Sequence, residues 1–102
     1  MKAYRFLEEA DQEFQEHIDY FIGHSLTAAE KFVDEVGAAI RDIREYPQVG
    51  SPISPIVRQR VLTGYKYSIL YVNTPNEIII VAVAPHRRRP GYWRRRLRHL
   101  QQ

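Results

Sequence analysis

The chain has 102 residues, 44% of them hydrophobic and 26% charged, which is ordinary for one globular domain, so we expect a single domain over 1–102. It contains no cysteine, which excludes disulfides, thiolate zinc sites and a cysteine nucleophile, and which agrees with a cytoplasmic protein. The longest apolar run, residues 78–84, is far shorter than the ~20 residues of a membrane-spanning helix, and we expect neither a signal peptide nor a membrane partner.

The net charge of +3 conceals a separation of charge along the chain. Residues 1–46 hold 11 acidic and 5 basic side chains, whereas residues 47–102 hold 10 basic and one acidic. Twelve of the 15 basic residues are arginines, whose planar fork binds both oxygens of a phosphate or carboxylate. This bias predicts a negatively charged partner, either a nucleic acid or an acidic protein segment.

The N-terminal part predicts a short strand and a helix. Residues 2–6 can form the strand. Apolar side chains then recur at intervals of three and four from Leu7 to Ile22, with acidic residues between them, which is typical of one buried helical face. Gly23 is a plausible end of this helix.

A second helix follows after a short turn. Either Ser25 or Thr27 could cap its N-terminus, and the helix should end before Tyr46-Pro47 because a residue preceding proline disfavours helical angles. Two helices joined by so short a turn should pack as an antiparallel hairpin.

After the loop 47–55 the period of the apolar side chains changes to two. Strands are predicted over 56–62, 65–72 and 77–84, separated by turns at 63–64 and 73–76. The last strand is apolar at nearly every position, which predicts cover on both faces. The order β-α-α-β-β-β indicates an α+β fold in which an N-terminal strand and an α-helical hairpin pack on a curved, mostly antiparallel sheet.

The C-terminal residues 93–102 admit two interpretations. Trp93, Leu97 and Leu100 fall at helical spacing, so a short helix with arginines on its outer face could form. A frayed tail is equally consistent with the sequence.

Five polar residues form the candidate site. Arg58 and Arg60 lie on the same face of one predicted strand, Lys66 is near the start of the next, and His86 and Arg88 follow the third. Hairpin pairing could bring them together at one edge, as a cationic groove for phosphate or for a carboxylate-rich peptide. The alternative is a solvent-facing surface whose charges discourage edge pairing.

The histidines do not predict a metal site, because none of the four lies at a recognisable ligand spacing, and we expect no metal or other cofactor. His86 could act as a general base, although a lone histidine is more often structural. Tyr92 and Trp93 could stack on a base or anchor the C-terminus, and we favour anchoring for Trp93.

Three features together resemble the RelE/ParE superfamily of bacterial type II toxins, over roughly residues 2–93. They are the order of the elements, the run Gly64-Tyr65-Lys66-Tyr67, and the ending His86-Arg87-Arg88-Arg89-Pro90-Gly91-Tyr92-Trp93 after an apolar strand. The resemblance implies a growth-inhibiting toxin, neutralised by a cognate antitoxin whose extended C-terminal segment wraps it. Operator DNA would be reached only through that antitoxin.

The superfamily has two functional branches. RelE-like members are ribosome-dependent mRNA endoribonucleases, and for them the resemblance implies the catalytic set Arg58, Arg60, Lys66, His86, Arg88 and Tyr92. RelE relies on lysines where this chain has arginines, which are poor bases, so His86 is the better base candidate.

ParE-like members poison DNA gyrase and are not nucleases. The histidine-arginine ending favours this branch, and with it a protein that is not an enzyme. The partner-binding residues would then be Arg87, Arg88, Arg89, Tyr92, Trp93, Arg94 and Arg95.

Overall fold

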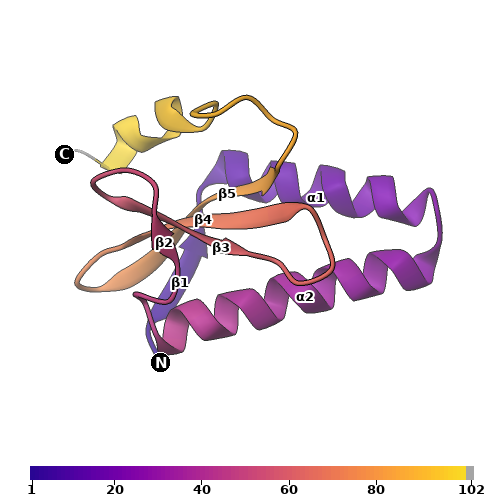
Figure 1. The fold of residues 1–102 in the computed structure, drawn as a ribbon, viewed down its shortest axis with the longest axis horizontal. Helices are drawn as coiled ribbons and strands as arrows, with labels where there is room; N and C mark the ends of the chain where they lie inside the picture. Colours follow the sequence, from indigo (N-terminus) through magenta and orange to yellow (C-terminus); the bar gives the residue numbers. More distant parts are fainter. Residues whose placement is uncertain (101–102) are drawn as a thin grey trace.

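The computed structural model describes residues 1–100 as a helical hairpin, a five-stranded sheet and a short C-terminal 3-10 helix (Figure 1). The elements in order are β1 (Ala3–Phe6), α1 (Glu8–Ile22), α2 (Leu26–Glu45), β2 (Ser51–Pro52), β3 (Val57–Val61), β4 (Tyr67–Asn73), β5 (Glu77–Pro85) and η1 (Arg94–Leu100). The α+β architecture agrees with the sequence prediction.

The two helices begin and end close to the predicted positions. Ser25 is the N-cap of α2, because its Oγ accepts a hydrogen bond of 2.9 Å from the backbone N–H of Ala28. The helix ends at Glu45, directly before Tyr46-Pro47. Gly23 follows α1 in a right-handed helical conformation, so it ends the helix without using the left-handed geometry that glycine permits.

The sheet has the order β1-β5-β4-β3-β2, and only the β1–β5 pair is parallel. The prediction of a mostly antiparallel sheet is therefore confirmed. The two-residue strand β2 was not predicted, because it lies within the proline-rich segment 47–55. Its Pro52 is tolerated because β2 is an edge strand. The connection between β3 and β4 is a loop over 62–66, longer than a tight hairpin, with Gly64 at φ +81°.

A register shift bends the middle of the sheet. Leu70 pairs with Ala82, whereas the next residue, Tyr71, pairs with Ile80, so Val81 has no opposite partner on β4. An extra residue of this kind kinks and twists the strand that carries it. The sheet is thereby curved between β4 and β5.

The core lies between the helical hairpin and one face of the sheet. α1 packs on β5 and α2 packs on β4. The aromatic rings of Phe21, Phe32 and Tyr67 fill the space between these layers, with centroids 4.7 to 6.1 Å apart. β5 is buried at every residue from Ile78 to Pro85, as predicted for a strand covered on both faces. The cover of the second face comes from the chain after β5.

Candidate functional site

The C-terminal segment, residues 86–100, covers the face of the sheet that the helices leave open. Trp93 is only 4% exposed, and Leu97 and Leu100 pack against the core. The predicted short helix is present as η1, of the 3-10 type, while residues 101–102 lie outside the described part of the chain. The anchoring interpretation of Trp93 agrees with its burial.

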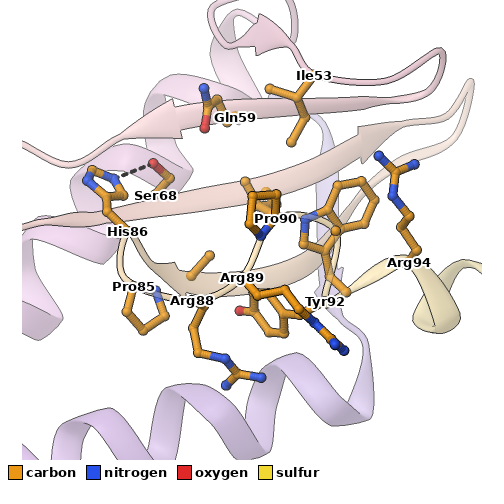
Figure 2. A pocket seen from close by; sticks show the side chains of 14 residues that line it. Ile53, Gln59, Ser68, Pro85, His86, Arg88, Arg89, Pro90, Tyr92 and Arg94 are labelled. Atoms are coloured by element: carbon orange, nitrogen blue, oxygen red, sulfur yellow. Dashed lines mark hydrogen bonds between the residues drawn. The ribbon is translucent and has the colours of Figure 1, made fainter.

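A cavity of about 300 Å³ lies between this segment and the sheet. Gln59, Ser68 and Leu70 form its wall on β3 and β4, and the loop after β5 forms the opposite wall (Figure 2). At one end the exposed His86 shares a hydrogen bond of 2.8 Å between its Nε2 and the Oγ of Ser68. Ser68 is 2% exposed, so this bond fixes the imidazole at the end of β5.

The arginines at the rim of the cavity do not converge on a common point. Figure 2 shows the side chains of Arg88 and Arg94 extending in opposite directions from the loop. The guanidinium of Arg88 lies 4.0 Å from the ring centroid of Tyr92, and that of Arg94 lies 5.2 Å from the Trp93 ring. Stacking on these rings holds the charges at the surface. The arrangement presents positive charge outward and does not form a cup for one anion.

The prediction that five residues form one cationic groove is wrong, because they do not lie on one face of the sheet. Arg58 donates a hydrogen bond of 2.7 Å to the carbonyl of Gly50, and Arg60 forms an ion pair of 2.9 Å with Asp42 on α2. Both side chains therefore belong to the helix-facing side of the sheet. Ser68 and its partner His86 lie on the opposite side, because neighbouring residues along a strand alternate between faces.

Of the other residues in the implied catalytic set, three line the cavity and Lys66 does not. Lys66 is exposed in the loop before β4, and only its carbonyl reaches the site, where it accepts a hydrogen bond of 2.9 Å from the backbone N–H of His86. His86, Arg88 and Tyr92 all line the cavity. Alternation correctly placed Arg58 and Arg60 on one face, but it could not say that this face meets α2.

A buried polar cluster around Glu13 was not predicted from the sequence. This carboxylate is 7% exposed and accepts hydrogen bonds from the hydroxyl of Tyr92 at 2.6 Å and from the backbone N–H of Val83 at 3.0 Å. It also forms an ion pair of 2.9 Å with Arg96, which was expected on the outer face of the C-terminal helix. A signal was present in the sequence, because Glu13 falls three residues after Ala10 on the apolar stripe of α1.

The Glu13 cluster satisfies backbone groups of β5 where β1 no longer runs beside it. The last bond between the N-terminal strand and β5 runs from the N–H of Leu7 to the carbonyl of Ile80, at 3.0 Å. Beyond that point Glu13 accepts from Val83 and Arg96 donates to the carbonyl of Val81 at 2.9 Å. Two side chains thus satisfy buried backbone groups that would otherwise be costly.

The hydroxyl of Tyr92 is held in its donor state. Burial and the hydrogen bond to Glu13 raise the pKa of Tyr92 above its ordinary value. Arg88 and Arg96 lie 4.0 and 5.1 Å from the ring centroid. Tyr92 therefore anchors the C-terminal segment to α1.

Residues 1–100 contain neither a metal-binding cluster nor a membrane-spanning helix. No three residues among the histidines and carboxylates of this part are arranged to hold a metal ion. No helix there is both long and apolar enough to cross a bilayer.

Comparison with known proteins identifies the family. The chain is similar to a protein in a solved structure described as "Chromosomal ParDE TA system from P. aeruginosa", with a TM-score of 0.71, 17% identity, and coverage of 83% of this chain and 96% of that one. No curated protein sequence matches the chain. Residues 4–90 match the family described as "ParE toxin of type II toxin-antitoxin system, parDE". Because this match spans most of the sequence, the chain belongs to the ParE family of toxins, within the RelE/ParE fold that its strands and helices form.

Proposed function

We propose that this toxin inhibits DNA gyrase by protein–protein contact in the cytoplasm. The observation that carries the proposal is the match to the ParE family over residues 4–90. The geometry supports a mode of action without catalysis, because Arg58 and Arg60 are engaged in bonds on the helix-facing side of the sheet, away from His86. The exposed arginines Arg87, Arg88, Arg89, Arg94 and Arg95 are the proposed contacts, while Tyr92 and Trp93 support them from below.

A supercoiling assay tests this proposal. Purified toxin is added to gyrase and relaxed plasmid, and both supercoiling and the accumulation of cleaved plasmid are measured. We expect supercoiling to be inhibited near stoichiometric toxin. The variant Arg87/Arg88/Arg89→Gln should inhibit more weakly. Arg5→Gln should match the wild type, because Arg5 lies on β1 and pairs with Glu77 at the start of β5, far along that strand from Arg87. Unimpaired supercoiling at excess toxin would exclude gyrase as the target.

A ribonuclease is the second candidate, and the exposed His86 beside the cavity favours it. Primer extension on translating ribosomes would then detect cuts within codons. His86→Ala should abolish the cuts while leaving the protein folded, although the loss of the hydrogen bond to the buried Ser68 hydroxyl should lower the melting temperature somewhat. Absence of cuts with the wild-type toxin would eliminate this function.

We also propose that a cognate antitoxin binds the tip of the helical hairpin. A groove of about 310 Å³ runs between α1 and α2 there. Leu26 and Ile22 on its walls are 64% and 50% exposed, which is unusual for large apolar side chains grouped on one surface. Glu30 and Asp34 flank the groove, so the matching antitoxin segment should carry apolar side chains bordered by basic ones.

Co-expression with the product of the adjacent reading frame tests the antitoxin site. The wild-type toxin should co-purify with that protein and growth should recover. Leu26→Asp should weaken both effects, because a carboxylate would be desolvated next to Glu30. The matched variant Val49→Asp, exposed at the opposite end of the hairpin, should leave them unchanged. Equal binding by both variants would place the antitoxin elsewhere.

A further inference from the structure

The C-terminal segment carries a concentration of positive charge that the described part of the chain does not neutralise. Seven arginines lie between residues 87 and 98. Within residues 1–100 only one of them, Arg96, forms an ion pair with a carboxylate. The other six are exposed, and they are Arg87, Arg88, Arg89, Arg94, Arg95 and Arg98. We call these six the arginine surface.

The arginine surface is held in place by the segment beneath it. Arg88 and Arg94 stack on the rings of Tyr92 and Trp93, which fixes their position and leaves the guanidinium N–H groups free to donate at the edge. Arg95 and Arg98 are three residues apart in a 3-10 helix, so they lie on one side of it. These four arginines are therefore positioned by the folded segment, with Arg88 and Arg94 on opposite sides of it, so the arginine surface is spread around the segment.

The aromatic and apolar side chains of the same segment point inward. Tyr92 is bonded to Glu13, Trp93 is 4% exposed, and Leu97 packs against the core. The surface therefore offers neither a ring for stacking on unpaired bases nor an apolar anchor for a peptide. It offers charge alone.

We infer that the arginine surface binds the phosphate backbone of duplex DNA without sequence preference. A duplex presents closely spaced phosphates along a rigid rod, and binding through phosphates alone needs only ordered cations. Single-stranded nucleic acid is less suited, because such binding commonly depends on stacked bases. An acidic peptide is also less suited, because the outer face lacks apolar contacts. The inference goes beyond inhibition of gyrase and does not depend on it.

The residues that form this surface extend beyond the region matched by the family. The family match ends at residue 90, whereas Arg94, Arg95 and Arg98 follow it. The full surface is thus a feature of this chain and not of the matched region.

Fluorescence anisotropy with a labelled 20-bp duplex tests the inference, using the whole toxin freed from any antitoxin. If six phosphates are contacted, the logarithm of affinity should fall with the logarithm of salt at a slope of about −5, or roughly a thousandfold between 50 and 200 mM salt. The variant Arg94/Arg95/Arg98→Gln should lose about half of that slope. The control Lys31/Arg41/Lys66→Gln removes the same charge from exposed positions elsewhere and should keep the wild-type slope.

Melting temperatures serve as the control, and unlabelled duplex, unlabelled single strand and poly-glutamate serve as competitors. Melting temperatures of both variants near that of the wild type show that the segment is still in place. Weaker competition by an unlabelled single strand and by poly-glutamate than by unlabelled duplex supports the inference. Stronger competition by poly-glutamate would overturn it in favour of an acidic protein partner, and stronger competition by the single strand would also overturn it. If the two variants lose the same amount of slope, binding depends on the net charge of the protein alone, and the inference of a defined surface is refuted. Gyrase inhibition by the wild-type toxin is measured separately, and none of these DNA-binding results decides it.

Discussion

Replacing Glu13 by glutamine should destabilise the fold strongly for so small a change in the side chain. The substitution keeps the shape of the side chain but removes its negative charge. It also converts one acceptor oxygen into an amide NH₂; at the position of Oε2 this group cannot accept the hydrogen bonds that Tyr92 and the Nη2 of Arg96 donate. Arg96 would be left without a counter-ion although its side chain is only 14% exposed.

These contacts allow the decrease in the free energy of unfolding to be estimated. Removing one partner of a buried ion pair costs roughly 3–5 kcal/mol, because the other charge stays buried and unpaired. Arg96 keeps a hydrogen bond of 2.9 Å to the carbonyl of Val81, so the lower end applies. We expect the free energy of unfolding to fall by about 3 kcal/mol. For a domain of this size that corresponds to a melting temperature lower by at least roughly 12 °C.

Urea denaturation followed by circular dichroism measures this loss. Glu16→Gln, an exposed acid on the same helix, serves as the matched control and should change stability by less than about 0.5 kcal/mol. The double variant Glu13→Gln/Arg96→Gln should cost clearly less than the sum of the two single variants. If Glu13→Gln is as stable as Glu16→Gln, the buried cluster does not hold the C-terminal segment.

Other substitutions test the remaining structural assignments. Ser25→Ala should cost about 1 kcal/mol of helix capping, measured by thermal denaturation, whereas Thr27→Ala should cost much less; equal losses would contradict the assignment of the cap. Tyr71→Phe removes a hydroxyl that accepts a hydrogen bond of 2.9 Å from the N–H of Gly50, so it should cost about 1–3 kcal/mol in urea denaturation, and a neutral effect would contradict this. Burial lowers the pKa of His17 below its ordinary 6.5. The unfolded chain therefore takes up the proton more readily than the folded one, and stability should be fully present above about pH 6.5 and decline below it. His17→Gln should flatten that decline, and an unchanged pH profile would exclude His17 as its source.

The order of the elements could be predicted from the sequence because it depends on local patterns. Apolar spacing located both helices, and the continuous apolar run located the buried strand β5. The short strand β2 could not be predicted, because it depends on pairing with β3 and not on its own Ser-Pro sequence.

The site was predictable only in part, for a physical reason. Alternation shows which residues share a face, so Arg58 and Arg60 were correctly paired, but it does not show what lies against that face. Asp42 on α2 meets Arg60 through tertiary packing, and Glu13 meets Arg96 across 83 positions of the chain. The position of Glu13 on the apolar stripe of α1 indicated burial, but the pairing of charges so distant in sequence leaves no local pattern.

The parallel pairing of β1 with β5 also determines when the molecule can assemble. Ala3 on β1 lies opposite Glu77 on β5. Glu13 on α1 forms its ion pair with Arg96, which is synthesised much later. Contacts between such distant segments form slowly, because a long loop must close before they contribute. A nascent chain that has not yet reached Arg96 lacks the charge that neutralises Glu13 and the tryptophan that covers the sheet. Native folding therefore requires that the segment carrying Trp93 and Arg96 has been synthesised.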